Sequence, residues 1–298
     1  MPNSFHLHVA FALLLLVACP LFTVAQDATA NPTVKYGFKA INFPGATGTD
    51  AYAINNKGKV VGFYTGAGCS QTSCGFTELK GKFTTIECSL ENATDLFDIS
   101  NKGEIVGAYS YFGGVNGFIW EGNSSCFPLS DSPANLTEGW GVNDGGTVVG
   151  FFEDAAGNFQ GFAYTKGKYT TIACPNWTDT RALGINDAGL IVGDNANSTS
   201  GPYNGFLYKS GSCIPVNVPN AASTSAKGIN KSGQISGWYT DKKGVTHGFV
   251  KTGSSYKTLN YPTAVATLAY HIDDAGQVAG AYSDTTGAAH GFIATPKK

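Results

Sequence analysis

Six equivalent positions of a repeated motif carry side chains that could do chemistry together. Each position stands four residues before an Ile or Val of the motif, and the six are occupied by Asp50, Asp95, Glu138, Arg181, Ser225 and Leu268. Carboxylates gathered in one place could bind a cation or a polyol, and two of them could act as acid and base in glycoside cleavage. The alternative is that they are solvated strand ends, because exposed acids usually do no more than solvate a surface.

Aromatic residues follow the same motif, and two of them stand outside the repeat. Flat aromatic surface beside hydroxyls and carboxylates suits a sugar or a peptide. The sequence therefore predicts a ligand-binding site composed of Asp50, Asp95, Glu138, Arg181, Trp177 and Tyr203. Aromatic residues at repeat-fixed positions are usually core, and the set expected to pack between repeats is Tyr64, Tyr109, Phe152, Tyr239 and Tyr282.

No pattern in the chain indicates a catalytic nucleophile, a metal ion or a cofactor. No serine stands in a nucleophile-elbow setting, and His247, His271 and His290 lack the Cys or His spacing of a metal site. We assign these three histidines to structure. A net charge of −2 provides no field for the phosphates of nucleic acid or for an anionic membrane, so neither is an expected partner.

The ionisable positions recur because the chain writes one phrase six times. The phrase "GINDAGLIVG" covers residues 184–193, and near-copies begin at Ala53, Asp98, Gly141, Gly228 and His271. A Gly-Phe dipeptide follows each copy, and successive Phe residues are 42 to 44 residues apart. Such regular spacing indicates one fixed geometry per unit.

Each unit contains four short runs rich in β-branched or aromatic residues, which predict strands a, b, c and d. In the fourth unit these are residues 181–186, 190–193, 204–208 and 213–218. A four-stranded unit of this length is typical of a propeller blade. The a–b and c–d turns share one rim, the turn rim. The b–c loops and d–a crossovers share the other, the loop rim, whose longer loops favour it as the functional face.

The chain ends predict a closed ring and not an open solenoid. The segment "GFKAINFPG" carries Phe38 and Ile41 at the spacing of strand d, whereas the last unit stops after strand c. The N-terminal strand can therefore complete the last blade. We expect an all-β, six-bladed propeller over residues 36–294, a tail over 295–298 and a monomer.

The N-terminal residues predict export. An apolar run over residues 9–19, followed by small residues up to Ala25, is typical of a signal peptide over residues 1–25 and is short for a membrane span. A linker over residues 26–35 follows. The alternatives to secretion are a periplasmic location and a lipid anchor through Cys19, which would then be the acylated cysteine of a lipoprotein.

Six cysteines remain after export, and an even number in an exported chain favours disulfides. The spacings suggest the pairs Cys88–Cys126 and Cys174–Cys213, but the strand order places those partners at opposite rims. We therefore expect one bridge within blade 1, among Cys69, Cys74 and Cys88. Cys126 and Cys213 are then expected to be buried thiols.

The pattern Gly-Ile-Asn-x-x-Gly-x-Ile-Val-Gly, followed by His-Gly-Phe, resembles the bacterial secreted repeats of the HAF family. Residues 246–249 and 289–292 match its His-Ala-Phe signature best, with Gly in place of Ala. The resemblance covers all six units. It implies an exported repeat protein and supplies no catalytic residue to carry across.

Together these patterns predict a secreted, non-catalytic propeller that binds a glycan, another extracellular polymer or a small ligand on the loop rim. One alternative is a glycan-acting hydrolase or lyase that uses Asp50, Asp95 or Glu138. A second is a structural surface protein without a ligand.

Overall fold

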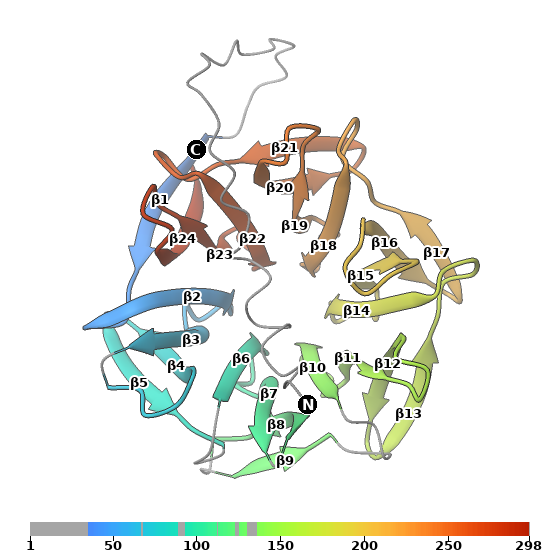
Figure 1. Cartoon of the computed structure of the whole chain (residues 1–298), viewed down its shortest axis with the longest axis horizontal. Coiled ribbons are helices and arrows are strands. Elements are labelled where there is room, and N and C mark those ends of the chain that lie inside the picture. The colour runs from blue at the N-terminus through green and yellow to red at the C-terminus, as the bar shows by residue number, and fades with distance from the viewer. Residues whose placement is uncertain are drawn as a thin grey trace, which may run out of the picture.

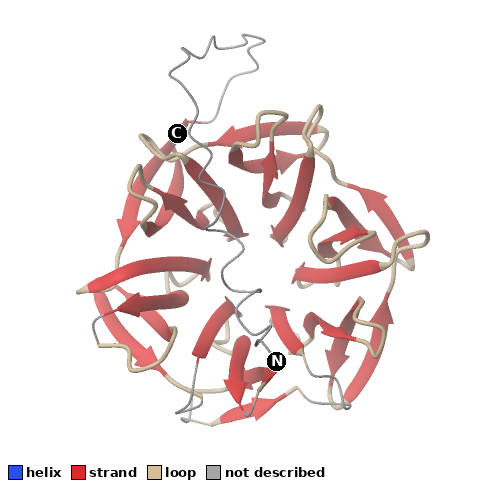
Figure 2. Cartoon of the chain, in the orientation of Figure 1, coloured by secondary structure: helices blue, strands red, loops and turns tan. Residues whose placement is uncertain are grey.

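The computed structural model describes residues 35–66, 68–88, 93–111, 113–122, 125–129 and 136–297. Within these residues all regular secondary structure is β-strand (Figure 2). The predicted signal peptide, most of the predicted linker and Cys19 lie outside them. In the part of the chain that is described, no helix has the length and apolar character needed to span a bilayer.

The strands form six antiparallel four-stranded sheets around one axis, which confirms the predicted six-bladed propeller (Figure 1). Blades 1 and 2 consist of β2 (Ala46–Ile54), β3 (Val60–Gly66), β4 (Cys74–Leu79) and β5 (Lys82–Ile86), then β6 (Ala93–Ile99), β7 (Ile105–Tyr111), β8 (Gly114–Trp120) and β9 (Cys126–Pro128). Blades 3 and 4 consist of β10 (Thr137–Val142), β11 (Val148–Glu153), β12 (Phe159–Thr165) and β13 (Lys168–Ile172), then β14 (Asp179–Ile185), β15 (Ile191–Ala196), β16 (Asn204–Lys209) and β17 (Ser212–Pro215). Blade 5 consists of β18 (Ser223–Ile229), β19 (Ile235–Thr240), β20 (Thr246–Thr252) and β21 (Ser255–Leu259).

Blade 6 joins the two ends of the described chain. It consists of β22 (Ala266–Ile272), β23 (Val278–Ser283), β24 (Ala289–Lys297) and, as its outermost strand, β1 (Lys35–Ile41). Phe38 pairs with Ala294 and Lys35 with Lys297, so the predicted closure is confirmed and residues 295–297 belong to the sheet. In Figure 1 the blue β1 lies beside the dark red β24.

The core lies between neighbouring blades and not at the axis. The Phe of each of the six Gly-Phe dipeptides that recur every 42 to 44 residues is at most 2% exposed, and the six are Phe76, Phe118, Phe162, Phe206, Phe249 and Phe292. Four of them, Phe76, Phe118, Phe249 and Phe292, belong to core clusters shared by neighbouring sheets, as Phe118 does with Leu96 of its own blade and Val61 of blade 1. Because each sheet buries both faces in this way, no blade has a stable core of its own.

A β-bulge interrupts the innermost strand of every blade at its pairing with the second strand. The register shifts between Ala51 and Ala53 in blade 1 and at equivalent places in the other five. The glycine that ends each phrase, such as Gly193, lies beside the bulge. A methyl group there would overlap the carbonyl oxygen of Arg181, and all six blades share this close approach. The final glycine of the phrase is therefore a packing requirement.

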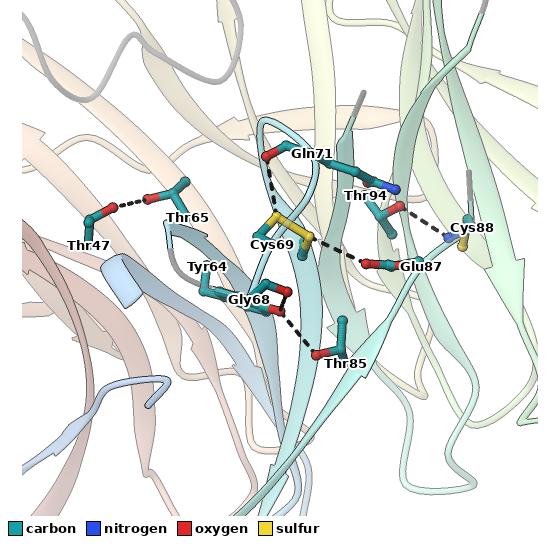
Figure 3. The surroundings of a disulfide bond; sticks show 11 residues. Thr47, Tyr64, Thr65, Gly68, Cys69, Gln71, Thr85, Glu87, Cys88 and Thr94 are labelled. Atoms are coloured by element: carbon teal, nitrogen blue, oxygen red, sulfur yellow. Dashed lines mark hydrogen bonds between the residues drawn. A yellow bond between two sulfur atoms is a disulfide. The ribbon is translucent and has the colours of Figure 1, made fainter. Parts of the chain in front are cut away.

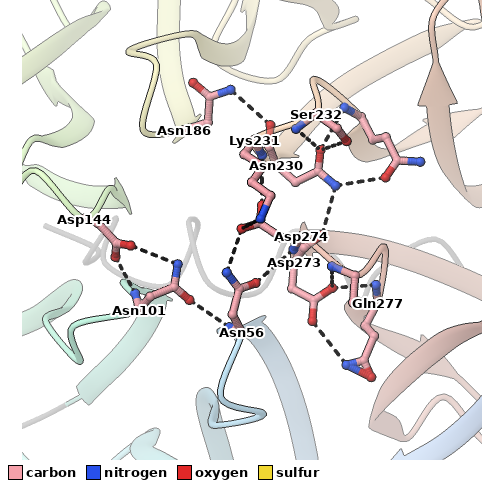
Figure 4. Close-up of polar contacts among 12 residues, drawn as sticks. Asn56, Asn101, Asp144, Asn186, Asn230, Lys231, Ser232, Asp273, Asp274 and Gln277 are labelled. Carbon is pink, nitrogen blue, oxygen red and sulfur yellow. Dashed lines mark hydrogen bonds and ion pairs between the residues drawn. The ribbon is translucent and has the colours of Figure 1, made fainter.

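The Asn and Asp residues of the phrase tie neighbouring blades together at the turn rim (Figure 4). The six side chains that we call the turn-rim belt are Asn56, Asn101, Asp144, Asp187, Lys231 and Asp274. The backbone N–H of Asn56 donates to Asn101 Oδ1 at 2.8 Å, and that of Asn101 donates to Asp144 Oδ1 at 2.7 Å. The same bond continues around the ring to the last blade, where Asp274 N–H donates back to Asn56 Oδ1 at 3.0 Å. The bond from blade 4 to blade 5 is missing because blade 5 has Lys231 at this position, and a lysine side chain has no acceptor atom.

A second, inner belt lies one residue earlier in the phrase. Asn186 Oδ1 accepts the N–H groups of its own turn, while its Nδ2 donates to the carbonyl of Asn230 in the next blade at 3.0 Å. Asn55, Asn143 and Asn230 make the equivalent bond. The inner belt covers the junction that Lys231 leaves open. The repeated Asn thus serves its turn and the neighbouring blade at once, a role beyond the turn chemistry expected of it.

In blades 3, 5 and 6 a side-chain contact across the loop stabilises the hairpin between the second and third strands. His290 Nε2 lies 3.0 Å from Asp284 Oδ2, and His247 stands in the same relation to Asp241. Gln160 and Asp154 form this contact in blade 3. His247 and His290 thus contact an Asp side chain across the loop of their hairpin.

In blade 1 a disulfide spans the equivalent loop. Cys74 occupies the position of these histidines and is bonded to Cys69, with Cα atoms 5.7 Å apart (Figure 3). The expected single bridge among Cys69, Cys74 and Cys88 is therefore confirmed.

The other two disulfides correct the prediction. Cys88 is bonded to Cys126 and Cys174 to Cys213, with Cα separations of 5.6 and 5.7 Å, so Cys126 and Cys213 are not free thiols. Adjacent strands twist by roughly 20–25°, so three steps turn the outermost strand by roughly 60–75° relative to the innermost one. The outer strands consequently run along the perimeter, as Figure 1 shows. The crossover that enters a blade can then contact that blade's outer strand.

The same slot holds aromatic pairs in other blades. Phe43 on the crossover into blade 1 meets Phe83 of β5, with ring centroids 5.4 Å apart. Tyr261 on the crossover into blade 6 meets Phe38 of β1 at 5.2 Å. The Cys88–Cys126 and Cys174–Cys213 disulfides therefore stand in the place of these aromatic contacts. Each belongs to the blade that its crossover enters.

Candidate functional site

The six predicted positions lie near the loop-rim start of the innermost strands, one per blade, and we call them the loop-rim ring. The structure assigns Asp50 to β2, Asp95 to β6, Glu138 to β10 and Arg181 to β14. Ser225 and Leu268 complete the ring on β18 and β22. The charges of Asp50 and Glu138 both act on Asp95, which lies between them in blade order. Blades 1 to 3 thus bring three carboxyl groups together.

Asp50 and Asp95 are acids held in a low-dielectric setting. Burial raises the pKa of Asp50 to about 6, an effect that a 3.5 Å hydrogen bond from the Tyr270 hydroxyl partly offsets. Burial, followed by the charges of Glu138 and Asp50, raises the pKa of Asp95 to about 7, and the Ser73 hydroxyl opposes this rise. Asp95 is 3% exposed, and the Ser73 hydroxyl, although it lowers the pKa of Asp95, makes no hydrogen bond of normal geometry with its Oδ1.

Glu138 and Lys227 contact the same tryptophan. The indole Nε1–H of Trp140 donates to Glu138 Oε2 at 2.6 Å. The Nζ of Lys227 lies 4.2 Å from the centre of the Trp140 ring, within cation–π range. Burial lowers the pKa of Lys227 to about 8, although the Asp194 and Glu138 charges oppose this.

Arg181 is engaged on the opposite side of the ring. Its Nε donates to Asp194 Oδ1 at 2.7 Å, and its guanidinium lies 4.1 Å from the centre of the Tyr203 ring. The Ser225 hydroxyl donates to the other oxygen of Asp194 at 2.5 Å, which joins blades 4 and 5. Asp194 is fully buried, and its ion pair with Arg181 balances its charge.

A layer of large side chains lies beneath the ring and blocks the channel. The bulged position of each innermost strand turns its side chain to the axis, and this central layer consists of Tyr52, Phe97, Trp140, Leu183, Lys227 and Tyr270. Tyr52 stacks on Tyr270 at 4.2 Å and Phe97 on Trp140 at 4.3 Å. The layer encloses a hollow of about 10 Å³, which has room for one water molecule at most.

The central layer was missed from sequence because the bulge breaks the alternation by which inward residues are counted. The signal that could have found it is a bulky residue two positions after each ring residue. Asp50 is followed by Tyr52, Asp95 by Phe97 and Glu138 by Trp140.

The other predicted site residues separate into two groups. Tyr203 joins the ring through Arg181. Trp177 is partly buried on the crossover between β13 and β14, and among the described residues no hydrogen bond, ion pair or ring contact joins it to the ring. Tyr64 stacks on Phe43 and Tyr282 on Tyr261, both at 3.6 Å, which confirms packing roles for these second-strand aromatics.

A second hollow lies at the opposite mouth of the channel. It measures about 50 Å³ and is lined by the two turn-rim belts and by His271. Most of the polar groups there are used in bonds between blades. Among the described residues no cluster of three or more His, Cys, Asp or Glu side chains could hold a metal ion.

Comparisons with known proteins provide information about the fold alone. No family model matches the sequence, and no curated protein matches it. Among solved structures, the chain is similar to TolB from Acinetobacter baumannii, with a TM-score of 0.56, 9% identity and coverage of 80% of this chain. The match spans 63% of the TolB chain.

Two further solved structures are also similar. AofleA from Arthrobotrys oligospora matches with a TM-score of 0.53 and 11% identity over 89% of this chain and 88% of that one. The Aleuria aurantia lectin bound to alpha-methyl-L-fucoside matches with a TM-score of 0.50 and 11% identity, over 83% and 90%. Likenesses at this identity show a shared propeller fold and nothing about the ligand.

Proposed function

We propose that the protein is an exported, non-catalytic binding propeller that holds a saccharide-type ligand at the loop-rim end of its channel. The observation that carries this proposal is the chemical difference among six structurally equivalent positions. Three adjacent blades present carboxyl groups and the fourth an arginine, although the same strand geometry accepts Ser225 and Leu268. Packing alone would not require buried charges here, because ionised groups are costly to bury.

Further support comes from the surroundings of the ring. Tyr203 and the central layer supply aromatic surface next to polar groups, a combination suited to sugars. Three disulfides fit an oxidising, extracellular compartment. Membership of the HAF repeats and a role like that of the similar Aleuria aurantia lectin are part of the same proposal.

A glycan-array screen of the mature chain, followed by calorimetry on any hit, tests the proposal. We expect the variants Asp95→Asn and Glu138→Gln to weaken binding by about 10- to 100-fold, the scale of a lost charged hydrogen bond. Glu121→Gln, an exposed charge outside the ring, is the matched control. Unchanged binding in both ring variants would place the ligand elsewhere, and an array without any hit would contradict the binding function.

One observation favours a second candidate function. The pKa of Asp95, raised to about 7, is suited to a general acid, and Glu138 and Asp50 are carboxyl groups close enough to influence it. A glycan-acting hydrolase would use such a pair. Asp95→Asn distinguishes the candidates, since an enzyme would lose turnover while retaining its substrate, whereas the binding protein releases no product in either form.

A further inference from the structure

Three exceptions to the sixfold repeat meet in one hollow inside the central layer. Where the other five blades have a tyrosine, phenylalanine, tryptophan or leucine in this layer, blade 5 has Lys227. At the next position of the strand four blades have Ala or Gly, whereas blade 2 has Asp98 and blade 6 has His271. The same strand geometry thus accepts apolar or small residues at these positions, so packing alone does not require the three. All three side chains line the hollow of about 10 Å³.

We propose that Lys227 is a nucleophile that forms an imine with a short hydroxyaldehyde, which enters the channel from the turn rim. A short hydroxyaldehyde is here an aldehyde of two or three carbons with a hydroxyl group next to the carbonyl. This covalent site goes beyond the proposed saccharide function, because its entrance is at the opposite mouth of the channel from the loop-rim ring.

The amine of Lys227 is available for this chemistry. Its Nζ lies 4.2 Å from the centre of the Trp140 ring and makes no hydrogen bond or salt bridge with any described residue. Loss of hydration in the layer lowers the pKa of Lys227 to about 8. At pH 7.5 about a quarter of these amines are therefore neutral and nucleophilic, compared with roughly one in a thousand ordinary lysines.

His271 provides a base in the same hollow. Its Nε2 lies 3.4 Å from Asp98 Oδ1, and the backbone N–H groups of Ile99 and Val142 donate to the Asp98 carboxylate at 2.8 and 2.9 Å. A ring nitrogen that faces a carboxylate carries the proton, which leaves Nδ1 as an acceptor. Nδ1 is buried and has no hydrogen-bond partner in the described part of the chain. Lysine, histidine and aspartate thus have the roles of nucleophile, base and orienting group.

The reaction needs no oxidant and no reductant. The lone pair of neutral Nζ forms a bond to the carbonyl carbon, and the π electrons of the C=O bond move to its oxygen. The two protons of the amine pass through His271 Nδ1 to that oxygen, the C–O bond breaks and water leaves. Amine and aldehyde thereby become imine and water.

The larger hollow at the turn rim limits the size of the aldehyde. His271 lines both hollows, and Ile229 and Asn230, which follow shortly after Lys227 in the chain, line the larger one. Its volume of about 50 Å³ has room for roughly four water molecules, which matches a chain of two or three carbons and is too small for a pyranose. Carboxylate oxygens accept more than one hydrogen bond, so Asp144 and Asp187 of the turn-rim belt can receive the hydroxyl group of the ligand.

Reductive trapping of the mature chain tests the inference. The chain is incubated at pH 7.5 with glycolaldehyde and cyanoborohydride, which reduces an imine to a stable amine, and peptide mapping by mass spectrometry locates the label. Lys80, an exposed turn lysine, is the internal control. We expect Lys227 to be labelled at least tenfold faster than Lys80, a preference that follows from its larger neutral fraction. Equal labelling, or no label on Lys227, would overturn the inference and leave the saccharide proposal intact.

Two further aldehydes test the predicted size and hydroxyl group. With glucose, which is too large for the hollow, the preference for Lys227 over Lys80 should disappear. With propanal, which has no hydroxyl group, the preference should be smaller than with glycolaldehyde. A preference for Lys227 with glucose would contradict entry through the turn-rim hollow, and an equal preference with propanal would contradict recognition of the hydroxyl.

The pH profile distinguishes Lys227 from an ordinary lysine. The charged groups that act on Lys227 are Glu138, Arg181 and Asp194, and the titratable groups that share its hollow are Tyr52, Asp98, Tyr270 and His271. Because Lys227 is already mostly neutral above pH 8, its labelling relative to Lys80 should fall about fivefold between pH 8 and 9. A constant ratio over this interval would contradict a lowered pKa as the source of the preference.

The variant His271→Ala separates proton transfer from access. Alanine is the residue of blade 1 at this position, so the fold should accept it. The change widens the passage to Lys227 but removes the base, and we expect labelling of Lys227 to slow at least fivefold with an unchanged melting temperature. Unchanged or faster labelling would contradict the role of His271.

The variant Lys227→Leu checks that packing does not require the amine. Leucine is the residue of blade 4 in the central layer. Its melting temperature should equal or exceed that of the wild type, because a poorly hydrated ammonium group without an acceptor is replaced by an apolar side chain. A large loss of stability would assign Lys227 a structural role and contradict the argument from the repeat.

Discussion

Asp95 shows how one residue links the stability of the ring to pH. Its folded pKa of about 7 exceeds the ordinary 3.8, so the folded protein binds more protons than the unfolded chain between these values. The free energy of unfolding therefore falls as pH rises from about 4 to 7, and above that window Asp95 lowers it by a constant amount. At neutral pH the folded protein therefore carries the buried charge of Asp95, which lowers its free energy of unfolding.

We expect Asp95→Asn to raise the free energy of unfolding at pH 8 by about 1–3 kcal/mol, because it removes a buried charge. The gain should shrink towards pH 4, where the wild-type acid is already neutral. Urea denaturation at pH 4.5, 6 and 8 measures the difference between variant and wild type.

Asp241→Asn is the control with the opposite sign. Hydrogen bonds from Val245 and Lys243 hold the pKa of Asp241 below its ordinary value despite some burial. Its contribution is present at neutral pH and is lost as pH falls through the folded pKa. If the two variants had the same pH trend, burial of Asp95 would not be the cause.

At the scale of the element, two glycines of one phrase have different reasons to be glycine. Gly193 packs against the Arg181 carbonyl, whereas Gly189 has open space around it but a φ of 74°. Gly193→Ala should cost more than 3 kcal/mol through steric overlap, and Gly189→Ala about 1 kcal/mol through strain. Thermal and urea unfolding of the two variants check the order, which would reverse if turn conformation outweighed packing.

The slot shared by disulfides and aromatic pairs leads to a second prediction for the elements. Phe38 and Tyr261 stand where blade 2 has Cys126 and Cys88. The double variant F38C/Y261C should therefore form a disulfide that locks β1 to the crossover entering blade 6. Its oxidised form should be about 2–4 kcal/mol more stable than its reduced form, beyond the same difference in the wild type.

Mass spectrometry under non-reducing conditions detects the bond, and melting with and without reductant measures its effect. Free thiols at both positions in the folded, oxidised protein would show that the slots are not equivalent.

The two disulfides that were mispredicted illustrate what strand order alone cannot supply. Counting along the meander puts Cys88 and Cys126 at opposite rims, but the accumulated twist turns β9 along the perimeter. Twist is a property of the assembled sheet and is not written in residue spacing. The equivalence of Cys126 with Phe38 and Phe83 was visible in the sequence, and so was the ring of Asp50, Asp95 and Glu138. The central layer was hidden by the bulge.

At the scale of the whole molecule, closure depends on β1. Ile41 is buried with residues of blades 1 and 6, and Phe38 packs on Phe292, so this strand joins the first and last blades. The six-fold repeat and the offset between chain ends were sufficient to predict this arrangement, because a spare strand has only one incomplete sheet to enter.

A chain that begins at residue 42 should lose this closure. The edge of β24 would then expose unpaired backbone groups, which promotes aggregation. We expect a lower melting temperature, lost hydrogen-exchange protection across β24 and larger species in size-exclusion chromatography, compared with a chain that begins at residue 35. A monomeric truncated protein with unchanged protection would contradict a closing role for β1.

The two belts at the turn rim make the molecule tolerant of single faults. Where Lys231 breaks the outer belt, Asn186 still donates to Asn230, and where Ser100 and Asp273 cannot extend the inner belt, Asn101 and Asp274 still bond to the next blade. Where two blades are joined by a bond of each belt, loss of one hydrogen bond leaves the other in place. Substitutions at these turns can therefore be tolerated one blade at a time. This tolerance is consistent with a phrase that occurs six times with a different sequence in each copy.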